Sequence, residues 1–156
     1  ERILASLRAE YDRTVSALQL PCNVLDRRHQ HSGVLAVVIA HQVAVFVRSV
    51  YLQGLLVMPE EAIPQALREV VPVRRRLAAI AAEAGLTLGE LALRYMLSQD
   101  GVTSVLTGVE TVAQIQENIA LFDRGPLAAD VLDAIGAAGP SLPEAILTPA
   151  LWPARQ

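Results

Sequence analysis

The sequence predicts an α/β fold in which about three parallel strands alternate with helices, either as a layered sheet or as a barrel that does not close. Segments with strand and helix patterns alternate along the chain, and such alternation produces parallel strands joined by right-handed crossovers. The clearest strand, VAVFV at residues 43–47, is continuously apolar, as is typical of parallel strands covered on both faces. At 156 residues the chain is shorter than the roughly 250 residues of a closed eight-stranded barrel, so we expect one domain, residues 1–156.

The first part of the chain is predicted to hold two helices and a strand. Apolar residues at helical spacing predict a helix over residues 3–10, and residues 16–20 form a short, mostly apolar strand. Asp26 is a candidate cap for a helix over residues 26–41, whose apolar residues form one stripe. Gly33 and the β-branched pairs that follow it leave a strand open as the alternative.

A long loop and two helices follow the second strand. Residues 48–62 contain a glycine, a proline and no steady apolar period, which predicts a loop at the carboxyl end of that strand. A proline at its start and a glycine at its end bracket a helix over residues 72–85. Thr87 and Glu90 are spaced as a capping box, which predicts a second helix that ends at the Asp-Gly pair at residues 100–101.

The third strand and its helix show the same order of signals. Residues 103–107 are predicted to form the strand, and Gly108 the turn that leaves it. Thr111 and Gln114 make another capping box, which begins a helix whose apolar stripe continues to residue 122. The sequence therefore repeats the strand-then-helix unit once more.

The chain is expected to end in an irregular tail. Residues 127–135 predict one more helix, after which residues 139–156 carry four prolines, too many for regular structure. Leu151 and Trp152 are the side chains expected to pin this tail to the surface of the domain.

Composition excludes several classes of partner. Hydrophobic residues make up 53% and charged residues 19%, against roughly 45–50% and 25% in an average soluble domain, so we expect part of the apolar surface to need a partner. A net charge of −3 argues against nucleic acid. The longest apolar run, residues 34–40, is far shorter than the ~20 residues that cross a bilayer, and no signal peptide opens the chain, so we expect a cytoplasmic protein away from membranes.

Cys22, the single cysteine, has apolar neighbours and is expected to be an inert buried thiol.

Polar residues follow each predicted strand. They are Gln19 and Asn23 at the first, Arg48 and Ser49 at the second, and Thr107 and Gly108 at the third, with Glu117 and Asn118 on the helix beyond. Ligands of parallel α/β folds bind at the carboxyl ends of the strands, so these groups are expected to converge on one rim. The alternative is that they finish turns and lie on a solvated helix face.

Four segments resemble a known family: SALQLPCNVLDRR, VAVFVRSVYLQGLL, LTLGELALRYMLSQDGVTSVLTGVETVAQIQEN and the closing Leu-Trp-Pro. In order and spacing they are similar to the last three strands, the helices and the C-terminal tail of an aldo-keto reductase barrel. The similarity spans residues 7–153, and its most specific part is the glycine turn followed by Gln114, Glu117 and Asn118. The resemblance implies an incomplete (β/α)₈ TIM-type barrel that belongs to an NADP(H)-dependent carbonyl oxidoreductase.

The same resemblance implies a cofactor site for NADP(H). Gln19 would hold the nicotinamide carboxamide, while Ser49, Tyr51 and Leu52 would line the pyrophosphate through hydroxyl and N–H groups. The helix start after Gly108 would meet the 2′-phosphate, because a helix N-terminus favours an anion. The implied residues are Gln19, Arg48, Ser49, Tyr51, Leu52, Gly108, Val109, Thr111, Gln114, Glu117 and Asn118.

The chain departs from the family pattern at this site. Arg48 stands where many members place an aromatic ring on the nicotinamide, and a guanidinium repels the oxidised, cationic ring. Val109 and Gln114 replace the hydroxyl and the arginine that often grip the 2′-phosphate. These departures weaken the distinction between NADP(H) and NAD(H).

No catalytic residue is expected in the chain. In this family a tyrosine donates the proton with help from lysine, aspartate and histidine, and all four lie on earlier strands. All 13 basic side chains here are arginine, so no lysine is present to lower the pKa of a tyrosine. A Tyr51 assisted by Arg48 is the remaining, weaker alternative.

Three functional hypotheses follow. The first is the cofactor-binding C-terminal portion of an aldo-keto-reductase-like enzyme, inactive by itself; a start at Glu1 inside a predicted helix is what we expect of a truncated product. The second is a truncated barrel that serves as an oligomerisation module, and the third is a subunit whose barrel is completed by a separate chain. Open strand edges favour association in each. The sequence does not define the substrate.

Overall fold

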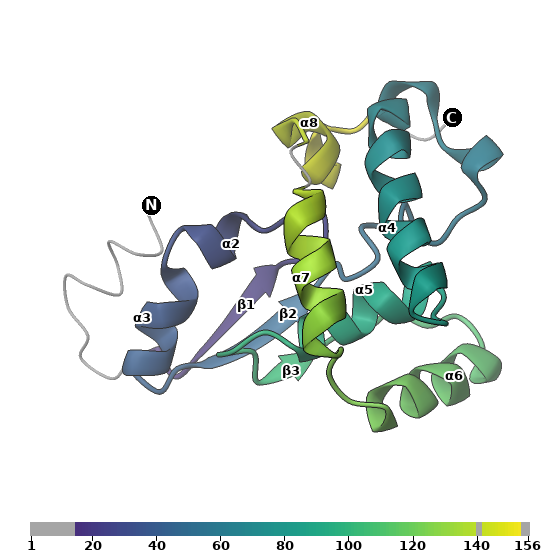
Figure 1. The fold of residues 1–156 in the computed structure, drawn as a ribbon. Helices are drawn as coiled ribbons and strands as arrows, with labels where there is room; N and C mark the ends of the chain where they lie inside the picture. Colours follow the sequence, from purple (N-terminus) through teal and green to yellow (C-terminus); the bar gives the residue numbers. More distant parts are fainter. Residues whose placement is uncertain (1–14, 140–141, 154–156) are drawn as a thin grey trace.

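The computed structural model describes residues 15–139 and 142–153, and it has the predicted α/β arrangement (Figure 1). Its strands are β1 (Ala17–Pro21), β2 (Ala44–Arg48) and β3 (Ser104–Val105), and they form one parallel sheet in the order β1-β2-β3. The helix predicted over residues 3–10 lies outside the described residues. Each observed strand begins one residue later than predicted.

The sheet buries one face and exposes the other. Side chains alternate between faces along a strand, and Leu20, Val47 and Val105 lie together in the core. On the opposite face Phe46 and Leu106 remain 36% and 39% exposed. The helices therefore cover a single side of these strands.

The helix predicted over residues 26–41 is two short helices, so this prediction was wrong, as was its strand alternative. They are α2 (Arg28–His31) and α3 (Val34–Ala40). Gly33 separates them with φ +78°, a left-handed conformation that interrupts the helix and that glycine adopts without strain. Asp26 still acts at the start, because its Oδ1 accepts a hydrogen bond from the Arg28 N–H at 3.3 Å.

The two helices after the long loop have the predicted positions. They are α4 (Val71–Glu83) and α5 (Leu88–Leu97). Thr87 caps α5, since its Oγ1 accepts from the Glu90 N–H at 3.1 Å. The second half of the predicted capping box is absent. The Glu90 carboxylate forms ion pairs with Arg94 and Arg124 instead of accepting a hydrogen bond from the Thr87 N–H.

The capping box of Thr111 and Gln114 is confirmed in full at the start of α6 (Val112–Asp123). The apolar stripe of this helix, however, stays in solvent, with Val112 and Ile119 exposed by 70% and 56%. The next helix, α7 (Ala129–Ala138), packs on α4 and begins two residues later than predicted.

The C-terminal tail is more regular than predicted. It contains α8 (Glu144–Leu147) and the 3₁₀ turn η3 (Pro149–Leu151), because proline fits the first positions of a helix, where its missing N–H costs nothing. Trp152 packs against the core as expected, and its Nε1 donates to the Ile146 carbonyl within the tail at 3.0 Å. Leu151 does not pack in this way, since it is exposed.

The predicted loop after β2 is a series of tight turns that leads to 3₁₀ turns η1 (Glu60–Ala62) and η2 (Gln65–Val70). Leu55 and Leu56 anchor it in the core. Arg74 of α4 fixes its far end by donating to the carbonyl oxygens of Leu56, at 3.2 Å, and Met58. The loop is therefore held by packing and by a cation on its carbonyls.

A buried carboxylate joins α5 to α6. Glu90 is 4% exposed, and its oxygens accept from Arg94 Nη1 at 2.9 Å and from Arg124 Nη1 at 2.8 and 2.9 Å. Arg94 also donates to the carbonyl oxygens of Gly125 and Pro126, at 2.9 Å each. This cluster sets the position of α6 relative to the rest of the domain.

We expect Glu90→Gln to destabilise the protein by about 3 kcal/mol, because Arg94 would lose its charge partner in a mostly buried site. The matched control is Glu60→Gln, which removes the carboxylate of an exposed pair with Arg75 and should leave the melting temperature unchanged. Thermal unfolding of both variants provides the measurement. Equal melting temperatures for the two variants would contradict the assignment.

The expectation that Cys22 is buried is confirmed. The thiol is 3% exposed and lies 3.4 Å from the carbonyl oxygen of Asp26. Burial, reinforced by the Asp26 carboxylate, raises the pKa of the Cys22 thiol from its ordinary value of 9.0 to about 12. At neutral pH it is therefore an uncharged core side chain.

This pKa predicts a loss of stability at alkaline pH. The unfolded chain releases the thiol proton near pH 9 and the folded chain only near pH 12, so the stabilisation is complete below pH 9 and is lost as the pH rises towards 12. Between about pH 8 and pH 10 the free energy of unfolding in urea should fall by about 1 kcal/mol more in the wild type than in Cys22→Ala. Parallel pH profiles for the two proteins would show that the thiol does not titrate in this way.

Candidate functional site

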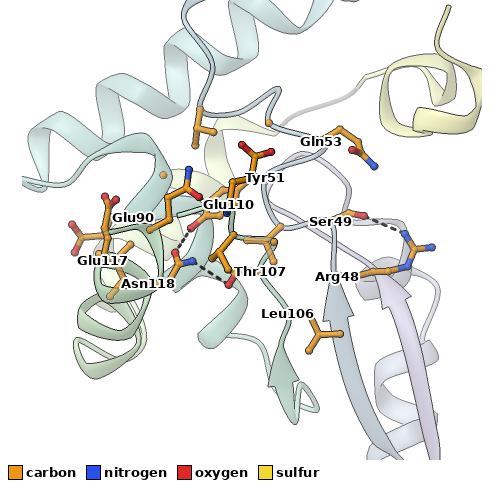
Figure 2. A pocket seen from close by; sticks show the side chains of 18 of the residues that line it. Arg48, Ser49, Tyr51, Gln53, Glu90, Leu106, Thr107, Glu110, Glu117 and Asn118 are labelled. Atoms are coloured by element: carbon orange, nitrogen blue, oxygen red, sulfur yellow. Dashed lines mark hydrogen bonds between the residues drawn. The ribbon is translucent and has the colours of Figure 1, made fainter. Parts of the chain in front are cut away.

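A pocket of about 850 Å³ opens at the carboxyl ends of β2 and β3, between the loop after β2 and α6 (Figure 2). Its position is the one expected for a ligand site in a parallel α/β fold. Eight of the eleven residues predicted for the site line it: Arg48, Ser49, Tyr51, Gly108, Val109, Gln114, Glu117 and Asn118. The predicted convergence of the second and third strand ends is thus observed.

The other three predicted residues lie outside the pocket lining. Gln19 is on the exposed face of β1, at the level of Phe46 in the register. The Leu52 side chain is buried in the core, and its N–H donates to the Ser49 carbonyl at 2.9 Å. Thr111 caps α6 through its hydroxyl.

Asn23, at the end of β1, has a structural role. Its Oδ1 accepts from the N–H groups of Leu25 and Asp26 at 3.0 Å each, and its Nδ2 donates to the Ser49 carbonyl at 3.2 Å. These three bonds give both the oxygen and the nitrogen of the buried amide group partners within the protein. The alternative that polar residues here finish a turn holds for Asn23.

Hydrogen bonds connect the walls of the pocket. Tyr51 Oη donates to Asn118 Oδ1 at 3.4 Å, and Asn118 Nδ2 donates to Thr107 Oγ1 at 3.2 Å (Figure 2). The chain of contacts joins the loop after β2, helix α6 and the end of β3. A ligand in this pocket would meet a wall whose polar groups are already oriented.

Tyr51 is not prepared to release a proton. Burial, reinforced by the negative charge of Glu117, raises the pKa of the Tyr51 hydroxyl above its usual value near 10. A general acid needs a pKa near the working pH, and a nearby cation would lower it rather than raise it. The environment of Tyr51 therefore opposes a proton relay with Arg48.

The loop that lines the pocket has an unusual backbone. Ser49, Leu52 and Gln53 have φ values of +62°, +47° and +54°, in the left-handed region that residues other than glycine seldom occupy. Such conformations cost free energy and cluster at ligand sites. The residue types carried no signal for this strain.

Carboxylates form the side of the pocket that sequence reasoning missed. Glu90 and Glu110 line it together with the predicted Glu117. The position of Glu110, directly before the capping box of α6, was a signal that could have identified it. Across the described part of the chain, no group of three or more His, Cys, Asp or Glu side chains is arranged to hold a metal ion.

Comparisons with known proteins agree with this arrangement. The model of the aldo/keto reductase family matches residues 2–139. No curated protein sequence matches the chain. Within residues 15–139 and 142–153, no helix is long and apolar enough to cross a membrane.

Solved structures of two aldo-keto reductases are similar to the chain. For AKR11C1 from Bacillus halodurans in its holo form, the TM-score is 0.72 at 24% identity, over 94% of this chain and 49% of that one. Its apo form gives the same TM-score and identity, over 94% and 50%. For the thermostable Tm1743 in complex with the inhibitor epalrestat, the TM-score is 0.59 at 18% identity, over 79% and 39%.

The chain spans about half the length of the AKR11C1 structures, which confirms the prediction of a partial TIM-type barrel with three parallel strands and flanking helices. The family model covers most of the sequence, and the described fold agrees with it. The chain therefore belongs to the aldo/keto reductase family of oxidoreductases.

Proposed function

We propose that the chain is the cofactor-binding portion of an aldo-keto reductase barrel and that its pocket holds a nicotinamide adenine dinucleotide. The observation that carries the proposal is the bridge from Tyr51 through Asn118 to Thr107, which fixes one polar wall across three separate segments. The family generally uses NADP(H), which supports a dinucleotide as the ligand.

Each part of the dinucleotide has a proposed position. The diphosphate lies near Arg48 and Ser49, whose side chains are joined by a 3.2 Å hydrogen bond at the end of β2. The adenosine lies against α6, next to Asn118. The nicotinamide extends over the exposed face of the sheet, where Gln19 is a polar group available to its carboxamide.

The chain is proposed to be inactive in carbonyl reduction by itself. It contains no lysine, and the pKa of Tyr51 is raised rather than lowered. When bound, the cofactor supplies the hydride, while the residues of this chain orient it and leave proton transfer to groups outside the chain.

Asn118→Ala should weaken binding of NADPH or NADH at least about tenfold, because it removes both hydrogen bonds of the polar wall. Fluorescence titration of the full-length protein measures the dissociation constant. Gln116→Ala is the matched control, since Gln116 lies on the same helix, outside the pocket lining, and should bind as the wild type does. Absence of dinucleotide binding by the wild type would refute the proposed function.

We propose, as a second function of the same chain, association through its uncovered apolar surface. The surface consists of the open sheet face, with Phe46 and Leu106, and the stripe of α6, with Val112, Ile115 and Ile119. Large exposed apolar patches commonly mark interaction sites. The proposed occupant is the polypeptide that completes the barrel, and the alternative is a second copy of the chain.

The isolated 156-residue chain should associate with itself when no completing polypeptide is present. Native mass spectrometry should detect dimers or larger species, and each homomeric fraction should reduce carbonyl compounds only at the background rate with either NADPH or NADH. Ile119→Glu should shift the population towards monomer, because it places a charge on the stripe. A monomeric wild type, or rapid reduction by a homomeric fraction, would count against this proposal.

A further inference from the structure

The two sides of the pocket carry opposite charge. Among the described residues that line it, Arg48 is the cation, and it lies beside Ser49 on one side, while Glu110 and Glu117 lie on the other (Figure 2). A third carboxylate of the lining, Glu90, is already neutralised by two arginines. The pocket is therefore positive near β2 and negative near the first turns of α6.

This polarity orients a dinucleotide, if the proposed function holds. The diphosphate is attracted towards Arg48, so the adenosine extends towards α6. There it meets the neutral polar side chains of Tyr51 and Asn118, which suit hydroxyl and base groups. Any further phosphate on the adenosine ribose would approach Glu110 and Glu117.

The N-terminus of α6 offers little compensation to such a phosphate. Gln114 Oε1 already accepts from the N–H groups of Glu110, at 2.7 Å, and Thr111, at 3.2 Å. The Gln114 N–H itself donates to Thr111 Oγ1 at 3.2 Å. The remaining attraction is the helix dipole, equivalent to about half a positive charge, which is less than the two opposing carboxylates.

Distant arginines do not change this balance. Arg124 follows the last residue of α6, and at 1.5 Å per residue it lies roughly 20 Å along the axis from the capping box. Its guanidinium is moreover paired with Glu90. The Glu90 carboxylate therefore offsets the charge of Arg124.

We propose that the pocket selects a dinucleotide with a free 2′-hydroxyl, NAD(H), over the 2′-phosphorylated form, and that Glu110, Gln114 and Glu117 determine this choice. A ribose hydroxyl is uncharged and can donate a hydrogen bond to a carboxylate. A 2′-phosphate adds negative charge beside two carboxylates and finds the N–H groups of Glu110 and Thr111, directly before α6, occupied by Gln114.

The test is a pair of fluorescence titrations of the full-length protein with NADH and NADPH at the same ionic strength. We expect NADH to bind about tenfold more tightly, because two like-charge contacts are removed, each worth a factor of a few at a partly exposed site. Gln114→Arg should reduce or reverse the preference for NADH, because it adds a cation and frees the N–H groups of Glu110 and Thr111. Glu117→Gln should also reduce the preference for NADH, and it leaves the capping box of Thr111 and Gln114 intact.

Gln116→Arg is the matched control for charge, since it adds the same cation to α6 outside the pocket lining and should leave the ratio unchanged. Equal binding of the two dinucleotides, or tighter binding of NADPH, by the wild type would overturn this inference and leave the proposed function in place. A wild-type preference that neither Gln114→Arg nor Glu117→Gln alters would overturn the role of these residues. Binding of neither dinucleotide would overturn the proposed function and the inference with it.

Discussion

Three parallel strands can bury one face of their sheet beneath the helices of their own chain, but they are too few to curve around and bury the other. Val45, Val47 and Val105 lie on the buried face, while Phe46 and Leu106 face outward. In a closed barrel, the face that carries Phe46 and Leu106 would line the interior, which side chains fill completely. The apolar groups left uncovered on the sheet are a consequence of this one-sided burial.

The site nevertheless has a defined shape, because its two walls are held from behind. Glu90 and its arginines fix α6 on one side, and Arg74 holds the loop after β2 by its carbonyl groups on the other. Both walls are held by charged groups. On the side of α6 these groups take the place of apolar packing, since α6 has no buried side chain of its own. The positive φ angle of Ser49 is strained, and buried leucines in the loop that follows it hold the backbone in this conformation.

Membership of a family and the choice of cofactor form rest on different features of this chain. The match to the family model places the chain among the aldo/keto reductases, whereas the charges around the pocket bear on the form of the cofactor. Family resemblance implies a phosphate at the N-terminus of α6. The occupied amides and the carboxylates there argue for a neutral group.

The sequence alone determined the starts of the strands to within one residue and the helices α4 to α6, because apolar period, capping boxes and proline or glycine punctuation act over a few neighbouring residues. Eight of the residues that line the pocket were expected from the resemblance to the aldo/keto reductase family. The sequence did not determine the break at Gly33, since a glycine can continue or interrupt a helix and only packing on either side decides. It also missed how Glu90 is used: the same residue suits a capping box or an ion pair, and Arg124, 34 positions away, comes near it only when α6 folds back. Tertiary structure decided these features because each depends on a group that is distant in the chain and adjacent in space.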